Sequence, residues 1–218
     1  PPAGEHDARI EVVATAQAMS RKGLSPGKSG NVSRRFADGM LVTPTGVAYD
    51  TLAPADIVAV AADGTWSAHG LAPSSEWRFH LAAYSARPDI AALVHTHSLK
   101  ATVLACAHRP IPAFHYMVAV AGGKDIPLVP YATFGTEELS RHVAAGLTAR
   151  NACLMANHGQ IAAGATLAEA LVLAEAVETL AAQFVEVLAL GTPHILSDAE
   201  MAEVLGRFAS YGQQPGRT

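Results

Sequence analysis

The sequence predicts a single α/β domain. Segments with helical spacing of apolar residues alternate with short apolar runs that are typical of buried strands. The 218 residues fit one compact unit, and no linker or internal repeat divides residues 1–218. Half of the residues are hydrophobic and 16% are charged, which is enough to bury a large core and excludes disorder as the main state.

The N-terminal half is expected to contain two helices with strands between them. Apolar residues recur at helical intervals from Asp7 to Lys22, and Gly23 is a typical helix stop. The run Leu24–Ser33 is rich in Gly, Ser, Pro and Asn and predicts a loop. Strands are then expected at Val32–Phe36, Met40–Thr43 and Asp56–Val60. The segment PSSE at 73–76 predicts the start of a helix that Pro88 ends.

The C-terminal half continues the alternation. Strands are expected at Ala92–His97, Val129–Ala132 and Ala152–Ala156, and helices at Ser98–Ala107 and Thr136–Ala149. Two capping boxes, Thr166–Glu169 and Ser197–Glu200, mark the starts of a long helix and of a last helix that runs to about Ser210. A Rossmann fold has no support, because the order is not a regular βαβ ladder with a Gly-rich nucleotide turn.

Composition restricts the partners and the compartment. The formal net charge of −4 leaves no broad basic surface, which argues against nucleic acid as a partner. Cys106 and Cys153 lie in Ala/Leu-rich surroundings and are expected to be buried free thiols of a cytoplasmic protein. The N-terminus lacks the pattern of a secretory signal. The apolar run Leu171–Leu190 is interrupted by glutamates and so predicts an amphipathic helix, not a membrane span.

The segment His95-Thr96-His97 is the clearest chemical signal. Residues two apart on a strand point to the same side, so both imidazoles could converge on one metal ion. The pair could also arise by chance, since the chain has ten histidines. His158, just after an apolar strand, and Glu76, at a helix start, are the further candidate ligands, although Glu76 could equally be a carboxylate that the helix dipole favours. Three histidines and a carboxylate would suit Zn(II) or another divalent first-row ion.

Three short segments combine flexible backbone with donor side chains. They are Gly30-Asn31-Val32-Ser33, Thr43-Pro44-Thr45-Gly46 and Ser74-Ser75. Backbone N–H and hydroxyl groups of this kind can bind a phosphate without a cationic residue. Each segment taken singly is better explained as an ordinary turn, and Lys28 as a solvated side chain.

Longer blocks of the chain resemble the metal-dependent class II aldolases of the L-fuculose-1-phosphate aldolase family. The blocks follow the family's order from about Asp7 to Tyr211 and are GNVSRRFADGMLVTPTGVAYDTL, LAPSSEWRFHLAAYSARPDIAALVHTHS, IPAFHYMVAVAGG, PYATFGTEELS and ANHG. The resemblance implies a central, mainly antiparallel sheet with helices on both faces. It also implies a homotetramer with active sites at the subunit interfaces.

The resemblance assigns roles residue by residue. It implies that Glu76, His95, His97 and His158 bind zinc, with Mn(II) or Co(II) as the other candidate ions, and that Glu76 also transfers protons. The implied substrate site consists of Gly30, Asn31, Thr45, Gly46, Ser74 and Ser75 around the phosphate, with Phe134 and Tyr211 at the aldehyde end. Tyr116 resembles a tyrosine that reaches into the neighbouring subunit's site. Without the resemblance, Tyr116 would be read as core and Tyr211 as a C-terminal anchor.

The implied reaction is a retro-aldol cleavage of a ketose 1-phosphate to dihydroxyacetone phosphate and a short aldehyde. The metal would act as the Lewis acid in place of a Schiff-base lysine, because none of the four lysines lies in an apolar run that would lower its pKa. We expect Glu76 to remove the proton from C1 of dihydroxyacetone phosphate. We expect Tyr116 to protonate the aldehyde oxygen in the synthetic direction.

Other activities on the same scaffold remain open from sequence. They are a sugar-phosphate 4-epimerase, a methylthioribulose-1-phosphate dehydratase and a non-catalytic adducin-like interaction domain, although the last would be expected to have lost the four ligands. L-fuculose 1-phosphate is the default substrate. A 5-deoxypentulose or 5-methylthioribulose 1-phosphate is the alternative, because the Asn157-His158-Gly159-Gln160 segment departs from the fuculose enzyme. His80, one turn after Glu76, could approach the site as a partner behind the ligands, but a packed or solvated role is favoured.

Overall fold

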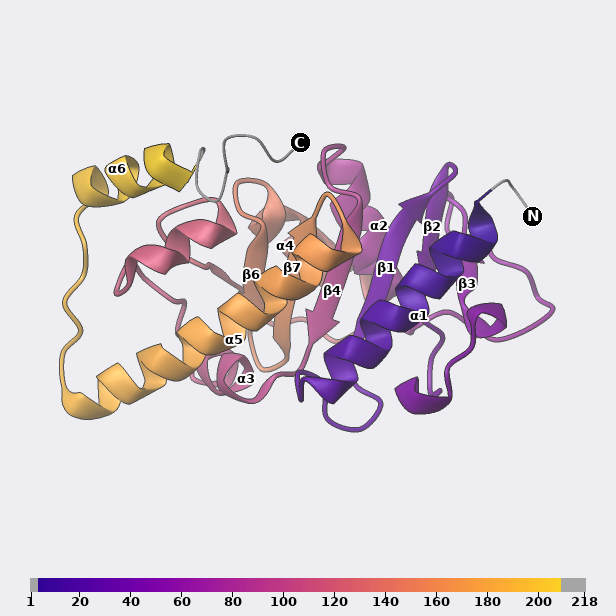
Figure 1. The fold of residues 1–218 in the computed structure, drawn as a ribbon, viewed down its shortest axis with the longest axis horizontal. Coiled ribbons are helices and arrows are strands. Elements are labelled where there is room, and N and C mark those ends of the chain that lie inside the picture. Colours follow the sequence, from indigo (N-terminus) through magenta and orange to yellow (C-terminus); the bar gives the residue numbers. More distant parts are fainter. Residues whose placement is uncertain (1–3, 209–218) are drawn as a thin grey trace, which may run out of the picture.

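A seven-stranded sheet between helices organises the computed structural model, which describes residues 4–208 (Figure 1). The strands are β1 (Asn31–Phe36), β2 (Gly39–Val42), β3 (Val58–Val60), β4 (Ala92–Thr96), β5 (Leu128–Val129), β6 (Ala152–Met155) and β7 (Gly159–Gly164). Their order across the sheet is β3-β2-β1-β4-β7-β6-β5, and every neighbouring pair is antiparallel except β5 and β6. The predicted α/β class and the implied mainly antiparallel sheet are therefore confirmed.

Helices cover both faces of this sheet (Figure 1). They are α1 (Glu5–Arg21), α2 (Trp77–Ala86), α3 (Leu99–Cys106), α4 (Glu137–Leu147), α5 (Leu167–Leu190) and α6 (Asp198–Phe208). Side chains alternate along β4, so Val94 packs into the core beneath α1, α3 and α5, whereas Leu93 packs with Phe79 beneath α2 and α4. Two separate apolar cores thus hold the sheet between its helical layers.

The predicted helix starts agree with the capping contacts. The hydroxyl of Thr136 accepts the N–H of Leu139 at 3.2 Å, and the hydroxyl of Thr166 accepts the N–H of Glu169 at 3.1 Å. Ser197 and Glu200 form the reciprocal pair of a capping box: each side chain accepts the backbone N–H of the other. These caps satisfy N–H groups that the first turn of a helix leaves without an intrahelical acceptor.

The strand predictions were less accurate. The sequence reading missed β7, which lies between β4 and β6 near the centre of the sheet. Its residues GQIAAG include small side chains with low strand propensity, and burial of both faces removes the alternation that marks a strand. The expected strand at Asp56–Val60 is shorter, because Pro54–Asp56 forms a 3-10 turn, and the one at Val129–Ala132 is replaced by the two-residue β5. Two further 3-10 segments are Tyr49–Thr51 and η3 (Tyr116–Ala121).

The two cysteines differ in exposure. Cys153 lies in β6 and is completely buried, as expected, but the expectation for Cys106 was wrong: it is exposed at the end of α3. An Ala-rich neighbourhood does not reveal which face of a short helix contacts the core. Burial raises the pKa of the Cys153 thiol to about 12.

One thiol per chain is therefore expected to react with a disulfide reagent in the native protein. Cys106 should be labelled about a hundredfold faster than Cys153 at pH 8, because only an accessible thiolate attacks the reagent. The absorbance of the chromophore that the reagent releases measures both labelling rates. Unfolding in urea should make the Cys153 thiol reactive as well. Cys106→Ser should remove the fast phase; two fast thiols in the native wild type would contradict the assignment.

Within residues 4–208, no helix combines the length and the apolar character that crossing a bilayer requires.

Candidate functional site

The candidate site forms where β4 ends. Antiparallel pairing of β1 with β4 places Asn31 opposite His95. Pairing of β4 with β7 places Gln160 opposite Thr96, so the turn that carries His158 lies beside the end of β4. Side chains from distant parts of the chain therefore reach one edge of the sheet.

Three histidines and a glutamate meet there. The rings of His95, His97 and His158 have centroids 4.9 Å from one another, at interplanar angles of 72°, 87° and 80°. The Glu76 carboxylate lies 3.1 Å from His95 Nε2 and 2.9 Å from His158 Nε2. One ligand atom from each of the four residues lies within 4.8 Å of all the others. The four residues that the sequence analysis named as metal ligands are thus brought together.

The side chain of Glu76 turns away from the helix start at which it lies. It is the N-cap residue directly before α2, and its carboxylate makes no capping hydrogen bond. Its backbone N–H is held by the hydroxyl of Ser74 at 3.3 Å, while the side chain turns toward the histidines. The contacts therefore differ from those of a carboxylate that only stabilises a helix start.

The donor set fits a divalent cation. His95 Nδ1 donates to the carbonyl of Gln160 at 2.7 Å, which leaves the lone pair on Nε2. That Nε2 lies 3.1 Å from His97 Nε2, and two lone pairs at this distance repel unless a proton or cation lies between them. A backbone carbonyl behind one imidazole, three inward nitrogens and one carboxylate is a typical zinc environment.

The ionisation of these groups agrees with that chemistry. Burial alone would disfavour a charged Glu76, but the neighbouring His95 and His158 outweigh it and hold the pKa of Glu76 below its usual range. Burial, together with electrostatic repulsion by the neighbouring imidazoles of His95 and His158, lowers the pKa of His97 to about 3. His97 is therefore neutral near pH 7, with a lone pair free for a ligand.

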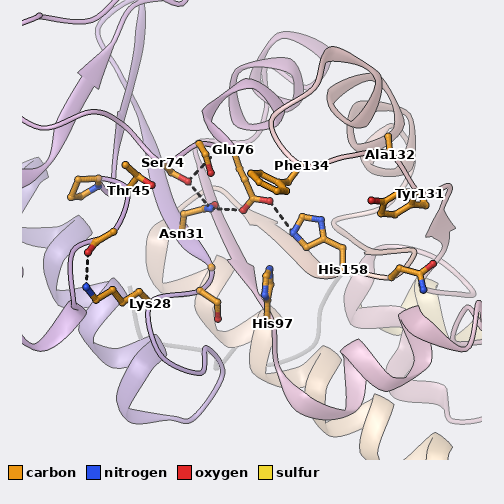
Figure 2. Close-up of a pocket in the computed structure, with 16 residues that line it drawn as sticks. Lys28, Asn31, Thr45, Ser74, Glu76, His97, Tyr131, Ala132, Phe134 and His158 are labelled. Atoms are coloured by element: carbon orange, nitrogen blue, oxygen red, sulfur yellow. Dashed lines mark hydrogen bonds and ion pairs between the residues drawn. The ribbon is translucent and has the colours of Figure 1, made fainter.

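Glu76, His97 and His158 border a pocket of about 320 Å³ (Figure 2), and His95 lies buried behind them. Figure 2 shows Asn31, Ser74 and Thr45 on one side of Glu76 and His158 on the other. Asn31 Nδ2 donates to Ser74 Oγ and to Glu76 Oε2, both at 2.9 Å. All six residues expected around a phosphate line this pocket, namely Gly30, Asn31, Thr45, Gly46, Ser74 and Ser75. Phe134, expected at the aldehyde end, lines it as well. Hydrogen-bond donors and the metal-ligand cluster therefore share one cavity.

Two glycines allow neighbouring backbone segments to lie close to the end of β4, which carries the histidines. Gly30 has φ +76°, and a Cβ there would lie 2.5 Å from the carbonyl oxygen of His95. A Cβ on Gly159 would lie 2.4 Å from the carbonyl oxygen of Thr96 and 3.1 Å from His97 Cδ2. Any larger residue at either position would displace the backbone that carries the histidines.

Further residues that were not predicted from the sequence also line the pocket. Tyr131 lies opposite the hydroxyl groups and belongs to the same PYATFGT block as Phe134, which was the available signal. Asn157 has φ 54°, a conformation uncommon for a residue other than glycine, and its side chain accepts a hydrogen bond from His108. Lys28, expected to be only solvated, also lines the pocket and donates to the carbonyl of Gly46 at 2.8 Å.

Tyr116, the predicted proton donor, does not line this pocket. Tyr116 begins η3, is 48% exposed, and lines a separate cavity against α6, so the core reading of Tyr116 is wrong. Its ring stacks on His115 with centroids 5.0 Å apart. Tyr211 lies outside the described residues.

Comparison with known proteins gives consistent matches over nearly the whole chain. Residues 10–185 match the family model described as Class II Aldolase and Adducin N-terminal domain. An L-fuculose phosphate aldolase of Escherichia coli is 50% identical over 203 residues, covering 93% of this chain and 94% of the relative. A 5-methylthioribulose-1-phosphate/5-deoxyribulose-1-phosphate aldolase of Rhodospirillum rubrum is 50% identical over 204 residues, covering 94% and 92%. A solved L-fuculose 1-phosphate aldolase superimposes with a TM-score of 0.89 at 37% identity, covering 93% of this chain and 96% of that one.

Proposed function

The chain belongs to the class II aldolase and adducin N-terminal domain family, and from this premise we propose that it is a metal-dependent aldolase. The substrate is a ketose 1-phosphate, cleaved reversibly to dihydroxyacetone phosphate and a short aldehyde. One observation carries the proposal: the histidine–glutamate cluster and the donor-lined phosphate region border the same cavity. A retro-aldol reaction needs both, because the developing negative charge must lie at a fixed distance from the bound phosphate.

Four residues would hold the metal: Glu76, His95, His97 and His158. Zinc is the ion that this set favours, with Mn(II) or Co(II) as alternatives. When bound, the ion supplies a Lewis acid that stabilises negative charge developing on the substrate. His95 is oriented for this by its Nδ1 contact to Gln160.

The polar side of the pocket would bind the phosphate. The hydroxyl-bearing side chains of Thr45, Ser74 and Ser75 and the amide of Asn31 line the cavity, next to the backbone of Gly30 and Gly46. This anchor places the hydroxymethyl carbon of dihydroxyacetone phosphate near the Glu76 carboxylate. Glu76 takes a proton from that carbon in the synthetic direction and returns it after cleavage.

The aldehyde end would be completed by another copy of the chain. Tyr116 is half-exposed and outside its own chain's pocket, which supports a role across an interface of a homotetramer. There it would protonate the aldehyde oxygen in synthesis and accept that proton during cleavage. We place the enzyme in the cytoplasm, a reducing compartment that suits an exposed free thiol such as Cys106.

The aldolase is favoured over the other activities of this scaffold. The relatives described above carry aldolase names, and the full ligand set argues against a non-catalytic interaction domain. An epimerase or dehydratase is not favoured by any feature of the pocket. Ala132 and the rings of Tyr131 and Phe134 suit a small apolar aldehyde, such as L-lactaldehyde, acetaldehyde or methylthioacetaldehyde.

Removal of the metal is expected to abolish cleavage. After dialysis against a chelator, turnover should fall by about a hundredfold or more, because the charge on the substrate then lacks its Lewis acid. Added Zn(II), Mn(II) or Co(II) should restore it. L-fuculose, L-rhamnulose, 5-deoxyribulose and 5-methylthioribulose 1-phosphates are offered in turn, and released dihydroxyacetone phosphate is coupled to NADH oxidation.

His97→Ala should lose metal and turnover together, whereas His69→Ala, which changes an exposed histidine outside the pocket, should lose neither. Full activity of the metal-free protein would contradict the proposal. Metal binding with no cleavage of any of the four substrates would favour the epimerase or the dehydratase.

A further inference from the structure

A chain of buried hydrogen bonds ends at the pocket. Tyr84 Oη lies 2.8 Å from Ser33 Oγ, which lies 2.7 Å from His80 Nδ1. The other ring nitrogen, His80 Nε2, lies 2.5 Å from Asn31 Oδ1. All four residues are at least 97% buried, and they connect α2 to β1 behind the polar wall of the pocket.

The partners of Asn31 determine the direction of every bond in this chain. Both protons of Asn31 Nδ2 are used, one toward Ser74 Oγ and one toward the Glu76 carboxylate, so Asn31 Oδ1 can only accept. His80 Nε2 must therefore carry the imidazole proton. Nδ1 is then the acceptor for the Ser33 hydroxyl, which in turn accepts from Tyr84. One proton arrangement satisfies the entire set.

We infer that His80 is a positioning residue that locks the side-chain amide of Asn31 with its two N–H groups toward the pocket. The inference rests on the proposed function, in which those N–H groups hold the Glu76 carboxylate and the Ser74 hydroxyl of the phosphate region. A flipped amide would present Oδ1 to the Glu76 carboxylate, which it repels, and would remove the N–H that orients the Ser74 hydroxyl beside the phosphate region. His80 prevents the flip because its Nε2–H would then face the Asn31 amide hydrogens.

The other residues of this hydrogen-bond network fix the tautomer and the orientation of His80. The Ser33 hydroxyl selects the tautomer with the proton on Nε2, as a hydrogen bond to one ring nitrogen does for a histidine. Phe79 stacks on the His80 ring at a centroid distance of 4.8 Å, which restrains its orientation. His80 is also fully buried, so solvent does not compete for either nitrogen. The expected packed role of His80 is thus extended by a specific polar task.

The test compares two substitutions of His80. His80→Phe keeps a planar ring but removes both nitrogens, and His80→Gln retains an N–H that can reach Asn31 Oδ1. Inorganic phosphate is the probe for the phosphate region, because its binding to the metal-loaded protein requires no turnover. The KM and kcat for the ketose 1-phosphate are measured in parallel.

We expect His80→Phe to weaken phosphate binding and raise KM by about tenfold each, with metal content unchanged. His80→Gln should recover most of both losses. Thr102→Val is the control for removing a buried hydroxyl elsewhere, since Thr102 Oγ1 has no partner within residues 4–208. It should leave phosphate affinity and KM unaltered.

The inference would be overturned if His80→Phe had the phosphate affinity and the KM of the wild type. It would also be overturned if His80→Gln were as impaired as His80→Phe. If His80→Phe does not fold, Ser33→Ala decides, because it frees the tautomer of His80 and should raise KM about threefold or more; an unchanged KM would refute the inference. A wild type that cleaves none of the ketoses and binds no phosphate refutes the proposed function first. A cleaving wild type with an unaffected His80→Phe refutes only the role of His80.

Discussion

Glu76→Gln is expected to reduce cleavage of the ketose 1-phosphate by about 10³-fold, because a neutral amide can neither deliver a proton to the enediolate that cleavage leaves nor take that proton up in the synthetic direction. The exchange of that carbon's proton with solvent should fall equally. Proton NMR of dihydroxyacetone phosphate in D₂O measures this exchange without any aldehyde. The low pKa of Glu76 means that the wild-type carboxylate is already ionised at neutral pH.

Metal analysis must accompany this measurement, since Glu76 touches His95 and His158. The three histidines remain in the variant, and we expect it to retain metal at saturating concentration. Glu175→Gln is the matched control: it makes the same chemical change at a partly exposed helix carboxylate that pairs with Lys22. Unchanged solvent exchange in metal-loaded Glu76→Gln would show that another group moves the proton.

Tyr116→Phe is expected to lower cleavage by about 10²-fold while metal and phosphate binding stay normal. Phenylalanine lacks the phenol that would exchange a proton with the aldehyde oxygen. Tyr116 does not line the pocket of its own chain. If it serves a neighbouring subunit, mixing two inactive variants must restore activity. Subunits with Tyr116→Phe keep Glu76, and subunits with Glu76→Gln keep Tyr116.

In a ring assembled from equal amounts of the two variants, about a quarter of the sites should combine an intact Glu76 with an intact Tyr116. Co-refolding followed by the coupled assay gives the recovered fraction. A mixture of Glu76→Gln with His97→Ala supplies the control, because both lesions affect the same side of the site and no combination is intact. Lack of recovery in the first mixture, with mixed oligomers present, would place Tyr116 in a structural role.

The candidate site was partly predictable because some of its signals are local. The spacing of His95 and His97 places both on the same side of one strand, although β4 ends at Thr96 and His97 follows it. Glu76 and Ser74 belong to a segment with a helix start, and that segment does precede α2. For His80 the local signal was only its place one turn after Glu76, and for Tyr131 only its place in the same block as Phe134. Burial among polar partners and position at a pocket rim depend on neighbours distant in sequence.

The sequence by itself determined the α/β class, the capped starts of α4, α5 and α6, and the residue types of the metal-ligand set. These properties depend on propensity, periodicity and capping, which act within a few residues. The tertiary structure alone decided that β7 enters the sheet beside β4, that Glu76 turns away from its helix, and that Cys106 is exposed. Strands that are buried on both faces show no alternation of apolar and polar residues, and their pairing depends on residues distant in sequence. The contacts that assemble this pocket therefore form only when the strand order of the sheet is established.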